Sequence, residues 1–158
     1  MTQKLIVIGA GMATGRVLEH LTDANVDIEI TLINAEPRGN YNRIMLSPVL
    51  SGDKTYTEIV THDDAWYAER NVTCRFGQKI TAIYRTAKTV TTDAGDTLDY
   101  DKLLFGTGSN PFMIPLPGHD LEGVIAYRDL DDTNRMMDMT GGNKVVVIGG
   151  GLLGLEAA

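Results

Sequence analysis

The sequence contains a single cysteine, Cys74, among 158 residues. One thiol cannot form an internal disulfide, and it excludes both a redox-active cysteine pair and a CxxC metal knuckle within this chain. Free cysteine often packs in protein interiors, so we expect Cys74 to serve as a small apolar residue on a strand.

Positive charge and long apolar runs are also scarce. The chain has 14 Lys and Arg against 21 Asp and Glu, a net charge of −7 and an isoelectric point near 4.8. Nucleic acids and anionic membranes attract clustered Lys and Arg, so neither is an expected partner. No apolar run approaches the ~20 residues that cross a bilayer, and residues 4–13 lack the cleavage site of a secretory signal. We therefore expect a cytoplasmic protein.

The first thirty-odd residues predict a βαβ unit. Residues 4–8 are a lysine and four apolar, branched residues followed by glycine, as in a strand buried on both faces of a parallel sheet. Apolar residues at 17, 18 and 21 give one stripe of a helix, and residues 28–33 predict the second strand. The expected fold class is α/β, with a Rossmann-like parallel sheet.

The middle of the chain is less regular, and it predicts a β-meander inserted beside the parallel sheet. Its alternating segments are residues 72–84, 89–92 and 97–98. A short helix is expected at 62–70 and another buried strand at 102–105. Three prolines within residues 110–118 indicate a stiff linker, and residues 129–139 predict a helix that Gly141 and Gly142 end.

The strongest signal is an internal repeat. Residues 4–11 and 144–151 both read Lys, four apolar residues and a glycine-rich turn, in matching register. In such a turn the first glycine permits the sharp reversal after the strand, and the second lets the backbone approach a pyrophosphate at the helix N-terminus. Two nucleotide-binding motifs in one chain are therefore predicted.

The two copies differ at the third glycine. The second copy completes the GxGxxG pattern with Gly149, Gly151 and Gly154. In the first copy Thr14 stands at the third position, and a glycine follows one residue late. Because the third glycine normally allows close packing of helix and strand, Thr14 is expected to push the helix slightly off the strand. The residues expected to line the first nucleotide site are Gly9, Gly11, Met12, Thr14 and Gly15.

Glu36 lies 21 residues after Gly15, at the end of the second predicted strand. An acidic side chain there accepts hydrogen bonds from the ribose hydroxyls of a bound dinucleotide, which favours an unphosphorylated ribose, as in FAD or NAD. The alternative is a solvated surface glutamate.

These motifs, together with residues 100–111 (YDKLLFGTGSNP), resemble the flavoprotein reductases with two dinucleotide-binding domains, also called the pyridine nucleotide-disulfide oxidoreductase superfamily. The resemblance implies FAD as cofactor and NAD(P)H as hydride donor. It also implies that the backbone of Thr107 and Gly108 lies against FAD, and that the strand through Ile80 touches the adenine. Gly106 stands where the superfamily usually has alanine.

Within the superfamily, residues 41–52 and 149–158 most resemble the large subunits of assimilatory NAD(P)H-dependent nitrite reductases. Ferredoxin and rubredoxin reductases are similar but less close. The resemblance implies that Arg43 faces the cofactor near its pyrophosphate, although a bare arginine here could equally be a surface charge. It places an iron–sulfur cluster and sirohaem only in segments beyond residue 158, and it allows a redox partner or a small subunit.

The expected function is transfer of hydride from NAD(P)H to FAD, with electrons passed onward, for nitrite reduction to ammonia in the whole protein. No residue is expected to act as catalytic acid, base or nucleophile. We expect no metal site, because the histidines are isolated in the sequence and are expected to be exposed: His20, His62 and His119.

Residues 1–112 are expected to form an incomplete FAD-binding domain, and residues 113–158 a linker and the beginning of an NAD(P)H-binding domain, cut within its glycine motif. Such a chain alone should bind FAD weakly or not at all and should not turn over. Two alternatives remain: a nucleotide-sensing domain without catalysis, and a dehydrogenase with one Rossmann domain. The second glycine motif and Thr107–Gly108 argue against the latter.

Overall fold

The computed structural model describes residues 2–24, 26–139 and 144–158. The chain divides into two compact units. The first comprises Met1–Tyr41 and Val60–Gly108, and the second comprises Asn42–Ile59 and Ser109–Ala158. Each unit is described by itself.

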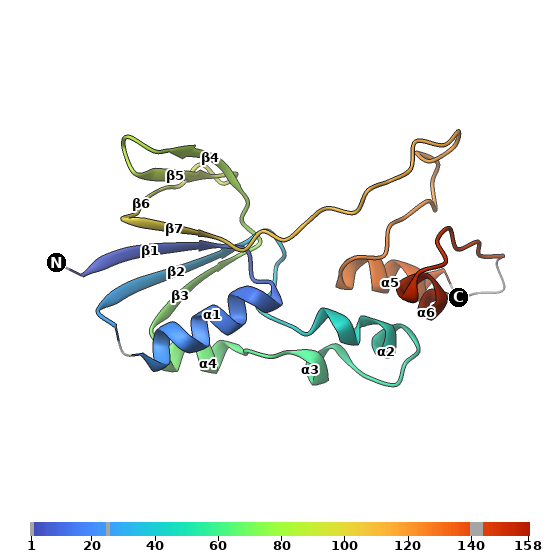
Figure 1. The fold of residues 1–158 in the computed structure, drawn as a ribbon, viewed down its shortest axis with the longest axis horizontal. Coiled ribbons are helices and arrows are strands. Elements are labelled where there is room, and N and C mark those ends of the chain that lie inside the picture. The colour runs from blue at the N-terminus through green and yellow to red at the C-terminus, as the bar shows by residue number, and fades with distance from the viewer. Residues whose placement is uncertain (1, 25, 140–143) are drawn as a thin grey trace. The chain divides into compact units, whose positions relative to one another are not determined.

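A four-stranded parallel sheet forms the centre of the first unit (Figure 1). Its strands lie in the order β3 (Val72–Phe76), β2 (Ile28–Asn34), β1 (Gln3–Ile8) and β7 (Lys102–Phe105). The other elements of this unit are helices α1 (Met12–Asp23) and α4 (Asp64–Glu69) and an antiparallel sheet of β4 (Ile80–Tyr84), β5 (Thr89–Thr92) and β6 (Thr97–Asp99). The Rossmann-like α/β fold with an added β-meander is confirmed.

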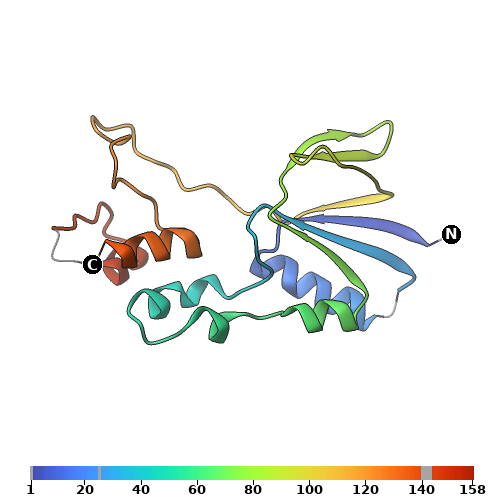
Figure 2. The ribbon, with the colours of Figure 1, turned by 180° about the vertical axis from the view of Figure 1, so that it is seen from behind.

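The last four residues of β1 are buried on both faces of the sheet, as their apolar sequence predicts. Leu5 and Val7 pack into a core that includes residues of α1 and α4, whereas Ile6 and Ile8 pack into a second core with residues of β5. In both views α1 and α4 cover one face of the parallel sheet, and the antiparallel sheet lies on the other side (Figures 1 and 2). Alternation of side chains along a strand explains the division between the two cores.

The expectation that all of residues 72–84 belong to the meander is wrong. Residues 72–76 form β3, which pairs in parallel with β2, and only residues 80–84 join the antiparallel sheet. Val72 is buried in the core beneath α1 and α4. Helix α4, predicted as a short helix at 62–70, supplies the connection that brings β3 alongside β2. A strand that follows such a crossover helix pairs in parallel rather than as a hairpin.

The second unit is helical in its regular elements. These are the 3-10 helix η1 (Arg43–Met45) and helices α2 (Leu46–Leu50), α3 (Tyr56–Ile59), α5 (Leu130–Asp138) and α6 (Leu152–Ala157). Helix α2 lies against both α5 and α6. The predicted helix at 129–139 is confirmed, and Asp129 caps it through a bond from the Asp132 amide to Asp129 Oδ1 of 2.9 Å. Gly141 and Gly142, predicted to end it, lie outside the described residues.

Residues 144–148, predicted as the strand of the second motif, form no strand in the described part of the chain. Their apolar side chains are largely exposed, including Val146 at 82% and Ile148 at 72%. A parallel strand of this kind is stable only between neighbouring strands and under covering helices, and the described residues of the second unit supply no strand to pair with it. Helix α6 nevertheless forms directly after the glycines.

Among the described residues, no helix is long and apolar enough to cross a membrane.

Candidate functional site

The carboxyl ends of β1, β2 and β7 meet at one edge of the parallel sheet. Ile8 lies opposite both Ile33 and Phe105, the Gly9 amide donates to Ile33 O at 2.7 Å, and the Gly106 amide donates to Ile8 O at 2.8 Å. The first glycine motif and the Thr107–Gly108 segment, nearly a hundred residues apart in sequence, are therefore neighbours. This edge is where parallel α/β sheets bind nucleotides.

Gly9 makes the turn between β1 and α1, and two constraints demand glycine there. Its φ of +98° lies in a region that side chains disfavour. A Cβ on Gly9 would also overlap Gly106 O and lie only 2.8 Å from Gly106 C and 3.0 Å from Thr107 Cα. The absence of a side chain at Gly9 thus lets the two backbone segments touch.

The N-terminus of α1 is open for an anionic ligand. Gly11 caps the helix in an extended conformation, no side chain bonds the first amides, and the first turn contains no acidic residue. Met12, the first helical residue, is exposed. The unsatisfied amides and the helix dipole therefore favour binding of phosphate oxygens.

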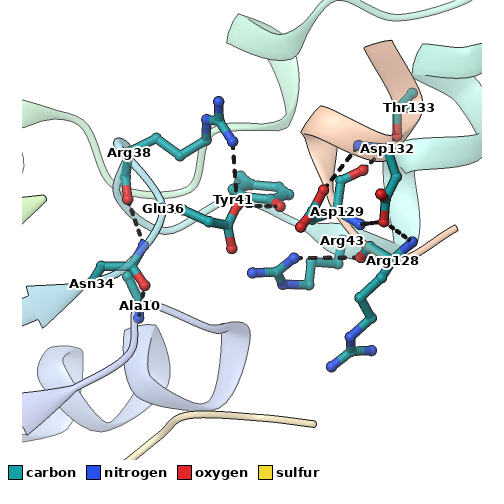
Figure 3. Close-up of polar contacts among 10 residues, drawn as sticks. All are labelled: Ala10, Asn34, Glu36, Arg38, Tyr41, Arg43, Arg128, Asp129, Asp132 and Thr133. Atoms are coloured by element: carbon teal, nitrogen blue, oxygen red, sulfur yellow. Dashed lines mark hydrogen bonds and ion pairs between the residues drawn. The ribbon is translucent and has the colours of Figure 1, made fainter. Parts of the chain in front are cut away.

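Two asparagines that sequence reasoning missed hold this turn in place. Asn34 Oδ1 accepts from the Ala10 amide at 3.2 Å, and Asn34 Nδ2 donates to Arg38 O at 2.7 Å (Figure 3). Asn40 Nδ2 donates to Gly11 O at 2.7 Å, and Asn40 Oδ1 accepts a hydrogen bond from the Tyr67 hydroxyl. The position of Asn34 at the end of a buried strand was a usable signal, whereas Asn40 lies in a loop without one.

Glu36 follows β2 and lies in the first unit with the glycine turn. The hydroxyl of the buried Tyr41 donates to Glu36 Oε2 at 2.9 Å, and Arg38 Nη1 lies 3.4 Å from the same oxygen (Figure 3). The Glu36 side chain is only 17% exposed. The alternative of a freely solvated surface glutamate is wrong, because a buried tyrosine and an arginine hold this carboxylate at the end of the strand.

Thr14 and Gly15 face the interior of the protein. Thr14, in the first turn of α1, has a buried side chain that lies close to Gly106. A Cβ on Gly15 would lie 2.9 Å from His62 Cε1 and 3.2 Å from Asn40 Nδ2. Their predicted role in cofactor binding stays a prediction.

Thr107 and Gly108 follow β7 at this edge of the sheet, and both are exposed. Ile80 begins β4, pairs with Thr92 and packs its side chain against the second core. That packing leaves only the main chain of Ile80 for the adenine contact implied by the resemblance, which no observation tests.

The remaining predicted residues belong to the second unit. Arg43 begins η1, and its Nη1 lies 3.4 Å from Arg128 O (Figure 3). Gly151 caps α6 with φ −80° and ψ 175°, almost the conformation of Gly11 before α1 at −77° and 172°. A Cβ on Gly154 would overlap Gly149 O. The second motif therefore retains the tight turn and close approach of a dinucleotide-binding glycine motif.

His62 differs from expectation. It lies just before α4, not in the helix predicted at 62–70, and it is buried rather than exposed, with Nε2 3.0 Å from Glu19 Oε1 and its ring 4.0 Å from the Trp66 ring, centre to centre. A hydrogen bond from Arg16 lowers the pKa of Glu19 below its usual value, and His62 adds to the effect. His20 and His119 are exposed as predicted. No cluster of three metal-ligating side chains occurs among the described residues.

Cys74 lies on β3, half-buried beside the first core, as predicted. Burial, with a smaller contribution from Asp64, raises the pKa of its thiol to about 11. A thiol held in this protonated form is a poor nucleophile.

A parallel sheet with a glycine turn, an open helix N-terminus and a strand-end carboxylate defines a dinucleotide-binding domain of the Rossmann-like class. Residues 3–158 match the family described as pyridine nucleotide-disulphide oxidoreductase, and the chain belongs to that family.

The similar proteins include reductases of several kinds. The chain is 44% identical over 158 residues to the nitrite reductase [NAD(P)H] of Bacillus subtilis (strain 168) and 40% identical to the assimilatory nitrate reductase electron transfer subunit of the same organism, covering 99% of this chain and 20% of each relative. The crystal structure of NADH:rubredoxin oxidoreductase from Clostridium acetobutylicum matches with a TM-score of 0.87 and 28% identity, over 100% of this chain and 41% of that one. The predicted resemblance to nitrite reductases is confirmed.

The chain spans about a fifth of the length of these curated relatives.

Proposed function

We propose that this chain supplies the FAD-binding part of an NAD(P)H-dependent flavoprotein reductase. The observation that carries the proposal is the approach of Gly9 to Gly106 and Thr107, which brings the glycine turn and the Thr107–Gly108 backbone to one edge. Residues 1–112 are assigned to FAD, and residues 113–158 to the linker and the first part of the NAD(P)H-binding domain.

The residues present fit a dinucleotide with an unphosphorylated ribose. The α1 amides after Gly11 offer donors for a pyrophosphate, and no acidic side chain in the first turn opposes it. The carboxylate of Glu36, already fixed by Tyr41, offers an acceptor for ribose hydroxyls. The backbone of Gly106 and Thr107 occupies the space that a Cβ on Gly9 would fill, which keeps this segment against the glycine turn.

When bound, FAD accepts hydride from NAD(P)H and passes electrons onward. The chain's own contribution is binding and orientation. Gly9 and Gly11 hold the turn, Glu36 fixes the ribose, and Thr107 and Gly108 present backbone to the cofactor. Cys74, the chain's one cysteine, lies on β3 with a protonated thiol, so these residues supply no redox-active disulfide.

Nitrite reduction to ammonia is the proposed overall reaction, supported by the identity to nitrite reductase. In this proposal the iron–sulfur cluster and sirohaem belong to segments outside these residues. A second candidate is delivery of electrons to a separate redox protein, supported by the similarity to an electron transfer subunit and to a rubredoxin reductase. Under that candidate the partner would be a ferredoxin, a rubredoxin or a nitrate reductase.

The test is an anaerobic titration of the protein encoded by the complete gene. We expect a visible flavin band that bleaches on addition of NADH or NADPH and returns on addition of nitrite. Return of colour only with an added ferredoxin or rubredoxin supports the second candidate. A colourless protein that binds nucleotide but cannot be reconstituted with FAD contradicts both and favours the nucleotide-sensing alternative.

A further inference from the structure

Thr14 occupies the position at which a complete GxGxxG motif has its third glycine. Its side chain is 1% exposed, and its Oγ1 has no hydrogen-bond partner among the described residues. A buried hydroxyl without a partner lowers stability, and a side chain at this position normally prevents close packing of helix and strand. Something else in the structure must therefore accommodate Thr14.

Gly106 provides the space. A Cβ on Gly106 would overlap Thr14 Oγ1 and lie 3.4 Å from both Thr14 Cβ and Gly9 O. The φ of Gly106 is not in the left-handed region, so its backbone conformation does not require glycine. The reason for glycine at 106 is steric, and the group that requires it is the side chain of Thr14.

The contact between Thr14 and Gly106 lies next to the edge of the sheet that is proposed to bind the nucleotide. Gly106 O is the atom that a Cβ on Gly9 would overlap, and Thr107 Cα lies 3.0 Å from that same Cβ position. Thr14, Gly106 and Gly9 thus pack in succession from the first turn of α1 to the turn after β1. A displacement of Gly106 by Thr14 would move Thr107 and Gly108 with it.

We propose that Thr14 is a positioning residue for the cofactor, and that Thr14 and Gly106 act as a coupled pair. The Thr14 side chain, packed where Gly106 has none, sets the distance between the α1 N-terminus and the Gly106–Gly108 segment. This inference rests on the proposed function, because the cofactor it positions is the FAD assigned above.

The neighbours of Gly15 explain why Thr14 and Gly15 cannot simply exchange places. A Cβ on Gly15 would lie 2.9 Å from His62 Cε1, and the buried His62 is held by Glu19 and packs against Trp66 with the two rings tilted by 55°. Glycine at position 15 is therefore needed whatever stands at 14. The late glycine is a separate adaptation to His62, and only Gly106 compensates for Thr14.

A double-mutant cycle on the protein from the complete gene tests the pair. The variants are Gly106→Ala, Thr14→Gly and the two together, and the readouts are the Kd for FAD and the visible circular dichroism of bound flavin. We expect Gly106→Ala alone to raise the Kd roughly tenfold or more, because it overpacks the contact. Addition of Thr14→Gly should restore the Kd to within about threefold of wild type and recover the flavin spectrum.

Ala13→Gly is the matched control, since it places the same helix-weakening residue on the exposed side of α1 and should not rescue Gly106→Ala. If Gly106→Ala fails to fold, recovery of folded, FAD-containing protein in the double variant supports the pair.

A double variant as impaired as Gly106→Ala, or unfolded, overturns the inference. The proposed function survives that result as long as the wild type holds FAD. A wild-type protein that cannot hold FAD overturns the proposed function and, with it, the positioning role.

Discussion

Glu36 shows how one carboxylate is held in place at the end of a strand. Its Oε2 accepts the Tyr41 hydroxyl at 2.9 Å, and Arg38 lies beside it, so the side chain is ordered before anything binds. Preordering a ligand-binding group lowers the entropic cost of association. The charge of the carboxylate also makes its hydrogen bonds to hydroxyls stronger than those of a neutral acceptor.

Replacement of Glu36 by Gln keeps the shape of the side chain but removes its charge. We expect the Kd for FAD to rise roughly tenfold, since hydrogen bonds to charged groups contribute about 1.5–3 kcal/mol. Fluorescence titration of the deflavinated protein measures this. Glu29→Gln, at an exposed position of β2, the strand that Glu36 follows, is the control. Equal affinity of the Glu36→Gln and Glu29→Gln proteins would show that Glu36 does not contact the cofactor.

The buried thiol of Cys74 predicts how the free energy of unfolding depends on pH. Its pKa rises from 9.0 to about 11 on folding because burial disfavours the thiolate. Above pH 9 the unfolded chain therefore loses this proton while the folded chain keeps it, so the free energy of unfolding falls between about pH 9 and 11. Urea unfolding across this range should show a steeper loss in the wild type than in Cys74→Ser. Parallel pH profiles for the two proteins would contradict the burial of the thiol.

At the scale of elements, the acidic residues at the start of α5 form a capping box. Asp129 Oδ1 accepts from the Asp132 amide, and the Asp132 carboxylate accepts in return from the Asp129 amide at 3.3 Å. Burial, with repulsion from Asp129, raises the pKa of Asp132 above its usual value. The reciprocal bonds satisfy two amides that a helix N-terminus otherwise leaves open.

Asp129→Ala should destabilise α5 by about 1 kcal/mol, the usual loss for an N-cap. Amide hydrogen exchange along residues 130–138 measures it, and exchange there should become roughly fivefold faster. Asp131→Ala removes the same charge from the first turn without removing the cap. If both variants exchange at the same rate, charge rather than capping stabilises the helix start.

The elements that could be read from the sequence are those whose own residues determine them. β1 was predictable because its run of apolar residues is buried on both faces, and α5 because its cap is local. β3 was not, since the choice between parallel pairing with β2 and a hairpin depends on where α4 directs the chain. Residues 144–148 have the sequence of a buried strand, but strand formation also requires neighbours.

The candidate site also divides into positions that the sequence predicts and contacts that only the folded chain creates. Gly9, Gly11 and Glu36 were predictable from a motif with fixed spacing. The partners that hold them were not, because the Tyr41 hydroxyl reaches Glu36, and Asn40 reaches Gly11, only through the folded loop after β2. The burial of His62 was likewise invisible, since its partner Glu19 lies 43 residues away.

At the scale of the whole molecule, the first unit brings two chain segments together at one edge of the parallel sheet, and Gly9 is the point where they touch. Gly9→Ala introduces both a strained φ and an overlap with Gly106 O, whereas Gly95→Ala introduces a similar φ of +87° with no atom within 4 Å of the new Cβ. Comparison of these two variants separates the effect of the overlap with Gly106 from the effect of backbone strain. Backbone strain alone costs about 1 kcal/mol.

The most direct test of the account is the FAD content of the protein from the complete gene, measured for wild type, Gly9→Ala and Gly95→Ala. We predict stoichiometric FAD in the wild type and in Gly95→Ala, and loss of FAD from Gly9→Ala. A Gly9→Ala protein that keeps its full complement of FAD, or a wild type that holds none after reconstitution, would contradict the assignment of this edge as the flavin site.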